Sequence, residues 1–201
     1  MSFREQRVDH FLKDLAAKQP TPGGGAVAGL CGAIAAALAQ MVVSYSLGKK
    51  NLAPHQPLLE NAAHRLERAR AIFLELADED AVAYALVNEL SRLPEADPRR
   101  QRELPGATQA AVAVPMSVAA ASVDALRLMH TLCGTSNPHL RSDLAIAAVL
   151  AEAICRAAKW NVLINLTSPT PRLDSAALRS QIDTLTADAL RLTGDIERLC
   201  Q

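Results

Sequence analysis

The segment PTPGGGAVAGLCGAIAAALAQMVVSYSLGKK, from Pro20 to Lys50, decides the fold of this chain. No charged residue occurs between Gln19 and Gly48, and most positions are Ala, Gly, Val or Leu. This composition predicts a helix over about 25–47 that is buried on most sides. Along it, small residues recur every four positions and form a face that a second helix can approach closely. They are Gly25, Gly29, Ala33 and Ala37.

Two other interpretations of this segment fit its content less well. By length it would span a bilayer, since about 20 apolar residues suffice. However, Ala and Gly gain little from lipid, and Gln40, Ser44 and Ser46 interrupt the run. GGGAVA also matches a loose dinucleotide-binding fingerprint, but Lys-Gln-Pro-Thr-Pro stands where that fingerprint needs a strand. We therefore predict a buried helix entered through a glycine turn, and no membrane partner.

The composition of the chain limits its class. Its 201 residues predict one domain over 1–201, and the 21 basic and 21 acidic residues cancel, so we expect no nucleic-acid partner. The N-terminus lacks the apolar core of a secretory signal. Four scattered cysteines show no metal-ligand spacing. We expect a reduced, cytoplasmic protein without a metal site.

The remaining segments are also typical of helices. The breakers from Leu93 to Gly106 predict a surface loop, and residues 134–141 predict a second one, after which Ser142 is expected to cap a helix. No strand alternation occurs, so we expect an all-α bundle of about six helices. Apolar spacing near 3.6 places helices at 3–17, 57–90, 107–132 (entered or kinked at Pro115), 143–166 and 175–199.

Three segments, in order, resemble the cyclodeaminase/cyclohydrolase family, which includes the cyclodeaminase part of formiminotransferase-cyclodeaminase and methenyltetrahydrofolate cyclohydrolases. The first is PTPGGG with its Ala-rich helix and the closing Gly48-Lys49-Lys50. The second is DEDAVAYALVNELSRLP, from Asp78 to Pro94. The third is NPHLRSDLAIAAVLAEAICRAAKWNVLINL, from Asn137 to Leu166. Together they extend over nearly the whole chain.

The resemblance implies an all-helical homodimer with a folate pocket and no metal or redox cofactor. The implied reaction is hydrolysis of 5,10-methenyltetrahydrofolate or deamination of 5-formiminotetrahydrofolate. The absence of a formiminotransferase segment in this sequence slightly favours the hydrolysis. The alternative is a non-enzymatic helical dimer that binds a folate-like molecule or a protein partner.

Two residues are the catalytic candidates. Asp80 falls on the apolar stripe of its helix, where burial raises the pKa of a carboxyl group unless the group is paired. Such a group suits general acid–base catalysis, although it could instead form a structural ion pair with an arginine. Lys49 is the second candidate, as a proton donor to the attacking or leaving group. Its position at a helix C-terminus is also explained by the helix dipole alone.

The substrate-binding candidates lie in the three family-like segments. The glycine turn exposes N–H groups that can hold an anion or a carbonyl. Asn161 and Asn165 share one helix face and need partners if buried, either a neighbouring backbone or the edge of a pterin. Ser142 and Asp143 are equally explained by helix capping. The full set is Pro22, Gly23, Gly24, Gly25, Lys50, Tyr84, Asn137, Ser142, Asp143, Asn161 and Asn165.

Overall fold

The computed structural model describes residues 2–167 and 174–201. Within them the chain forms six α-helices and three short 3-10 helices, with no strand, as predicted. The α-helices are α1 (Val8–Ala16), α2 (Gly24–Ser44), α3 (Gln56–Ser91), α4 (Pro98–Leu132), α5 (Arg141–Asn165) and α6 (Ser175–Cys200). The 3-10 helices are η1 (Phe3–Glu5), η2 (Lys50–His55) and η3 (Pro138–Leu140).

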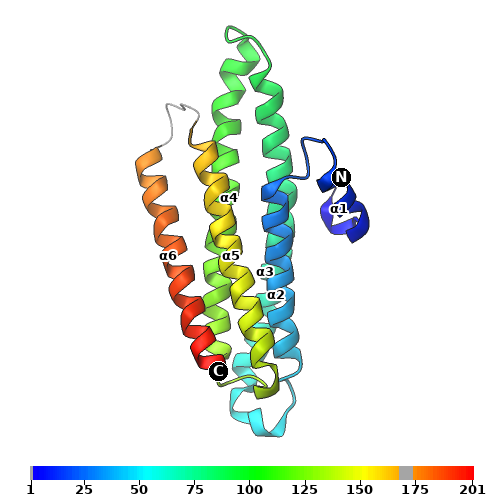
Figure 1. Cartoon of the computed structure of the whole chain (residues 1–201), viewed down its shortest axis with the longest axis vertical. Coiled ribbons are helices and arrows are strands. Elements are labelled where there is room, and N and C mark those ends of the chain that lie inside the picture. The colour runs from blue at the N-terminus through cyan, green and yellow to red at the C-terminus, as the bar shows by residue number, and fades with distance from the viewer. Residues whose placement is uncertain (1, 168–173) are drawn as a thin grey trace.

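Helices α2 to α6 run side by side as an elongated bundle (Figure 1). Helix α2 packs against α3 and α5, and α6 packs against α5 and α4. The α3–α4 hairpin is the longest part and continues well past the N-terminus of α2 (Figure 1). This difference in length leaves a step on the bundle where α2 begins.

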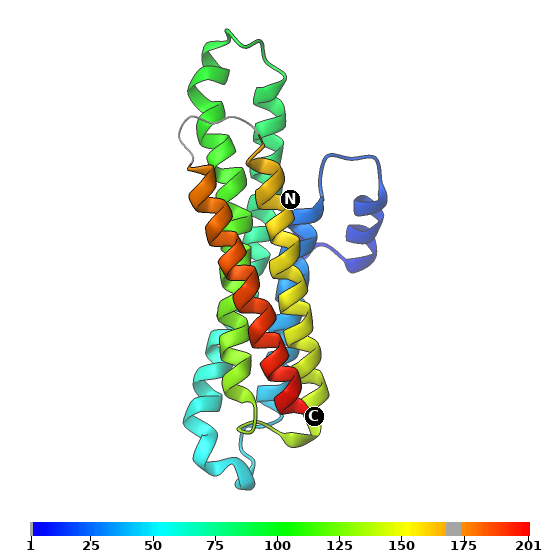
Figure 2. The same ribbon diagram turned by 60° about the vertical axis from the view of Figure 1, so that its left-hand side comes forward.

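The N-terminal segment stands beside the bundle as an arm (Figure 2). The single helix expected over 3–17 is wrong, because Gln6 and Arg7 separate η1 from α1. Asp78 of α3 explains the break: its carboxylate accepts hydrogen bonds from the Ser2 hydroxyl and from the Phe3 N–H, at 2.5 and 2.7 Å. These contacts fasten η1 to the bundle, so the chain must turn before α1.

The loop expected from Leu93 to Gly106 is also partly wrong, since α4 begins at Pro98. The Asp97 side chain accepts hydrogen bonds from the N–H groups of Arg99 and Arg100 and caps the helix. Proline at the first position of a helix loses no hydrogen bond, because that N–H has no partner in any helix. Pro105 and Pro115 both lie inside the continuous helix α4.

Ser142 does not cap α5, contrary to the expectation. The helix begins one residue earlier, at Arg141, and its N-cap is Leu140 without a side-chain hydrogen bond. The preceding η3 is capped by Asn137, whose side chain accepts from the His139 N–H, and η3 leads directly into α5. The start of α5 is therefore set by the turn before it.

The small-residue face of α2 packs against α3, as its spacing predicts. A Cβ atom added to Gly29 would lie 2.7 Å from the Ala77 Cβ and 2.8 Å from the Phe73 carbonyl oxygen. A Cβ on Gly32 would lie 2.4 Å from the Phe73 ring. Glycine here lets two helix backbones approach more closely than any side chain would permit.

Replacement of Gly29 by Ala is expected to destabilise the protein by about 1–3 kcal/mol, the usual range for overpacking a core. The clash involves backbone of α3, which cannot move aside as a side chain can. Gly106→Ala is the matched control, because nothing lies within 4 Å of the added Cβ in α4. There we expect a gain of about 0.5–1 kcal/mol from helix propensity. Denaturant unfolding measures both, and equal effects would contradict the packing argument.

Two helices, α2 and α4, are long and apolar enough to cross a membrane by length and composition. In α2, 56% of the most apolar window is buried inside the bundle, and in α4 61% is. The buried core helices of a water-soluble bundle meet the same criterion.

Candidate functional site

A cavity of about 300 Å³ lies at the step where α2 begins. Four helices and the glycine turn meet there, so residues far apart in the sequence face one space. The lining residues are Thr21, Gly23, Gly24, Gly25, Asp80, Tyr84, Val87, Ala111, Asn161, Ile164 and Asn165.

Asp80 lies at the N-terminus of α2 although it belongs to α3. A Cβ atom on Gly25 would lie 2.0 Å from the Asp80 Cγ, so the carboxylate occupies the space that a side chain would fill. The N-cap of α2 is Gly23, which has no side chain, and the carboxylate of Asp80 instead accepts a hydrogen bond from the Ala26 N–H. Glycine at position 25 is therefore required for this arrangement.

The Asp80 carboxylate is partly buried and belongs to none of the ion pairs in the described part of the chain. Within the described residues, Asp80 therefore does not form the structural ion pair with an arginine that was the alternative to a catalytic role. Burial raises the pKa of Asp80 above its ordinary value, and the Ala26 hydrogen bond lowers it by less. A carboxyl group with a raised pKa in a cavity suits proton transfer near neutral pH.

The two asparagines of α5 face the cavity one helical turn apart. The Oδ1 atom of Asn161 lies 3.4 Å from the position a Cβ on Gly24 would take. The Nδ2 atom of Asn165 donates a 2.6 Å hydrogen bond to the Ala111 carbonyl of α4. Together with Tyr84 of α3, these side chains provide amide and hydroxyl groups to the lining of the cavity.

Five predicted site residues lie elsewhere. Lys49, Lys50, Asn137, Ser142 and Asp143 stand at the other end of the bundle, where α2 ends and α5 begins. Asn161 is 19 residues after Ser142 in the same helix, which corresponds to a distance of about 28 Å. Within one chain the predicted site is therefore divided into two groups.

The polar atoms of Asn137 are used in structural hydrogen bonds. Its N–H donates to the Ser46 hydroxyl at 2.8 Å, its Nδ2 donates to the Tyr45 carbonyl, and its Oδ1 accepts from the His139 N–H. Asn137 thereby holds the end of α2 against the start of η3.

Pro22 is buried next to the glycine turn and does not line the cavity.

Four lining residues were not predicted: Thr21, Val87, Ala111 and Ile164. Helix periodicity would have indicated two of them, because Val87 is seven residues after Asp80 and Ile164 is three residues after Asn161. Ala111 had no such signal, since only the packing of α4 against α5 brings it to the site.

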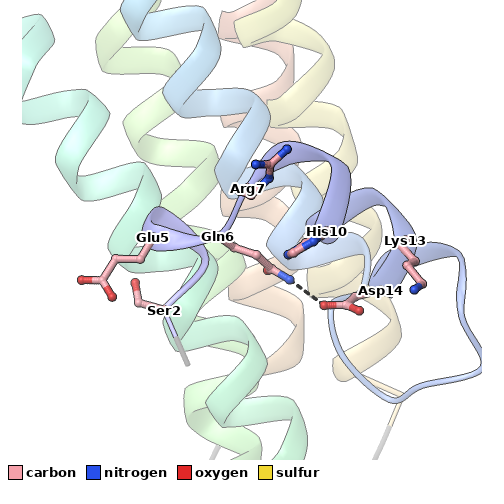
Figure 3. A pocket seen from close by; sticks show the side chains of 7 residues that line it. All are labelled: Ser2, Glu5, Gln6, Arg7, His10, Lys13 and Asp14. Carbon is pink, nitrogen blue, oxygen red and sulfur yellow. Dashed lines mark hydrogen bonds between the residues drawn. The ribbon is translucent and has the colours of Figure 1, made fainter.

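A larger cavity, about 620 Å³, lies between η1 and α1 (Figure 3). We do not place the site there, because its walls come from one short stretch and its charged residues are mostly exposed. The residues that line this larger cavity are Ser2, Glu5, Gln6, Arg7, His10, Lys13 and Asp14.

Within the described residues, no three His, Cys, Asp or Glu side chains lie together as the ligands of a metal ion would.

Comparison with known proteins shows the family of the chain and its fold. The family model described as Formiminotransferase-cyclodeaminase matches residues 7–184. Formimidoyltransferase-cyclodeaminase from Sus scrofa is 30% identical over 89% of this chain and 34% of that protein. The protein of the same name from Mus musculus is 31% identical over 94% of this chain and 36% of that protein. The chain thus spans about a third of the length of these relatives.

Two further relatives match over most of their length. Methenyltetrahydrofolate cyclohydrolase from Methylorubrum extorquens is 27% identical over 92% of this chain and 90% of that protein. The crystal structure of formiminotetrahydrofolate cyclodeaminase from Thermotoga maritima superposes with a TM-score of 0.90. It is 29% identical, and the alignment covers 98% of this chain and 96% of that one.

Proposed function

Since the chain belongs to the formiminotransferase-cyclodeaminase family, we propose that it acts on a one-carbon adduct of tetrahydrofolate. The reaction is that of a methenyltetrahydrofolate cyclohydrolase or of a formiminotetrahydrofolate cyclodeaminase. The observation that carries this proposal is the Asp80 carboxyl, partly buried and facing a cavity with two amides. Full-length relatives with both names support it.

In the hydrolysis, water adds to the cationic carbon between N5 and N10 of the methenyl substrate. Asp80 accepts a proton from the water as the C–O bond forms. The carbon–N5 bond then breaks, N5 takes up a proton, and the hydroxyl proton is lost as the formyl C=O forms on N10. One proton is released overall. The negative charge of ionised Asp80 also stabilises the cationic substrate.

In the deamination, N10 attacks the formimino carbon and forms a tetrahedral centre at the same carbon, with an amino group in place of the hydroxyl. The imino nitrogen takes up two protons and N10 loses one, so ammonia leaves as the methenyl cation forms and one proton is consumed overall. Both reactions require a group that gives and accepts protons beside one carbon, which is what a carboxyl of raised pKa provides. The same cavity therefore suits either reaction.

We propose that the ligand's flat ring edge binds the amides of Asn161 and Asn165, because amides offer both donors and acceptors. We propose that neither reaction uses a metal or a redox cofactor, because the reacting carbon keeps its oxidation state and Asp80 transfers the protons. The four free cysteines fit a reducing, cytoplasmic setting, which stays a prediction.

The test is to incubate the protein separately with 5,10-methenyltetrahydrofolate and 5-formiminotetrahydrofolate. We expect the methenyl absorbance to fall faster than the uncatalysed rate in the first case, or to rise with release of ammonia in the second. If neither substrate turns over but folate binds in titration, the non-enzymatic alternative holds. If folate does not bind either, the proposed ligand is wrong.

We also propose that the protein is a homodimer that packs through the outer face of α2 and α5. These helices are neighbours, and large apolar side chains stand exposed along both. Several exposed large apolar side chains on neighbouring helices are typical of a subunit interface. The exposed residues on this outer face are Ile34, Tyr45, Ile146, Val149, Trp160 and Ile164.

An antiparallel twofold arrangement would also reunite the divided site. The cavity lies at one end of this face, and Ser142 and Lys49 lie at the other. In this arrangement the second copy lies antiparallel beside the first and brings its lysines toward the cavity of the first. The second copy thereby supplies a cation and a proton donor, which one chain alone does not place at its own cavity.

Ile146 tests the interface, because it is 52% exposed on α5 and remote from the cavity. Ile146→Glu is expected to give monomers, since a buried unpaired charge at the interface costs several kcal/mol. Leu190→Glu on α6, where the residue is 65% exposed, is the control and should stay dimeric. Sedimentation measures both. A dimer that tolerates Ile146→Glu would place the interface elsewhere.

The shared site has its own test, by mixing two inactive variants. Asp80→Asn and Lys49→Ala chains are refolded together so that mixed dimers form. If each site uses Asp80 of one chain and Lys49 of the other, one of the two sites in a mixed dimer is intact and activity returns. Failure to regain activity would show that the two residues do not act in one shared site.

A further inference from the structure

Pro115 changes the hydrogen bonding of α4 at the cavity. It lies inside the helix and has no N–H group. In an α-helix the N–H of each residue donates to the carbonyl four residues earlier, so Pro115 cannot donate to Ala111. The Ala111 carbonyl is thus available to a donor outside its own helix, and Ala111 is one of the residues that line the cavity.

The donor is Asn165 of α5. Its Nδ2 approaches the Ala111 carbonyl oxygen to 2.6 Å. Because a carbonyl can only accept, this bond also fixes which end of the amide faces α4. The Oδ1 atom of Asn165 then points away from Ala111, and no group of the described residues donates a hydrogen bond to it, so it can accept one from a ligand. An amide without such a partner would sample both orientations.

We propose that Pro115 is a positioning residue for the substrate, acting through Ala111 and Asn165. Because Pro115 cannot donate a helical hydrogen bond, the Ala111 carbonyl remains available to orient the Asn165 amide. The Oδ1 atom of Asn165 is then a fixed acceptor for an N–H group of the ligand ring. This inference rests on the proposed function for its ligand. The hydrogen bond from Asn165 to Ala111 does not depend on the proposed function.

The experiment compares Pro115→Ala with Pro105→Ala, two changes of the same kind in the same helix. The carbonyl that Pro105 leaves free belongs to Gln101, an exposed residue that does not line the cavity. Alanine at 115 restores the N–H that bonds Ala111, which competes with Asn165. We expect KM to rise about fivefold, as for loss of one hydrogen bond, with kcat nearly unchanged. Pro105→Ala should leave KM unchanged.

A double-mutant cycle separates positioning from a general effect on the helix. In an Asn165→Ala background, Pro115→Ala should raise KM no further. The melting temperature should not fall in Pro105→Ala, because alanine favours the helix. Pro115 is buried, so the cavity left in Pro115→Ala offsets part of the same gain, and KM is compared under conditions where both variants are folded. An unchanged KM in Pro115→Ala, or full additivity with Asn165→Ala, would overturn the proposal.

A second readout does not require turnover. The side-chain NH₂ resonances of Asn165, assigned by their loss in Asn165→Ala, should move toward free-amide positions in Pro115→Ala and stay in place in Pro105→Ala. If the resonances behave so but no folate is consumed, the proposed function fails and the orienting role of Pro115 stands. If they do not move in Pro115→Ala, the orienting role is wrong whatever the activity.

Discussion

Replacing Asp80 by Asn is expected to lower kcat/KM by about 10²- to 10⁴-fold, the range for removing a general acid–base group. Asparagine has nearly the same shape and keeps an oxygen that accepts the Ala26 hydrogen bond. It cannot take up or release a proton in this pH range. The steady-state rate with whichever substrate turns over measures the loss. Activity at the wild-type level would remove Asp80 from the chemistry.

The same variant should show that this carboxylate is held at a cost to stability. Burial raises the folded-state pKa of Asp80 above 3.8, its ordinary value. Between the ordinary pKa and the raised pKa, the folded protein therefore binds more protons than the unfolded chain. The wild type therefore loses stability from this group as pH rises through the raised pKa. The amide in Asp80→Asn does not titrate, so the melting temperature of the variant relative to wild type should increase as the pH rises above about 4, the ordinary pKa of an aspartate.

Asp78→Asn is the control for Asp80→Asn. Asp78 lies two residues earlier in α3 and binds Ser2 and Phe3 of the arm, away from the cavity. Its replacement should loosen the arm and lower stability while kcat/KM stays near the wild-type value. If both variants lose activity equally, the loss reflects α3 as a whole and not a proton transfer at Asp80.

Gly25→Ala is expected to have the second largest effect, a loss of about 100-fold in kcat/KM, as for a 1 Å misplacement of a reacting group. The added Cβ would lie 2.0 Å from the Asp80 Cγ and Oδ1 and 2.2 Å from Oδ2. The carboxylate is the end of a side chain and moves aside, so the protein should still fold. Its displacement from the cavity is what lowers the rate.

Two comparisons test that explanation. Combined with Asp80→Asn, Gly25→Ala should cause little additional loss, because the group that it displaces no longer transfers protons. Gly29→Ala, one turn further along α2, clashes with α3 without touching Asp80 and should lower stability more than activity. A full additional loss in the double variant would mean that Gly25 acts on the substrate independently of Asp80.

The extents of four helices were close to the sequence prediction: 25–47, 57–90, 143–166 and 175–199 against α2, α3, α5 and α6. Each has a long apolar pattern, and such patterns determine which face is buried. The errors lie at the first helix, at the start of α4 and at the cap of α5, where particular side-chain contacts or a preceding turn set the start of the helix. Asp78 interrupts the first helix and Asp97 starts α4 early, and neither is apparent from apolar spacing.

The sequence by itself determined that α2 is an uncharged helix with a glycine face, and that a carboxylate and two amides lie on apolar helix faces. These are properties of single helices, read from residue type and period. Only the tertiary structure decided that the Asp80 carboxylate rests on Gly25 and that Asn165 is oriented by Ala111. Those contacts join residues 54 or more positions apart, and their geometry depends on how the helices pack, which no local pattern specifies.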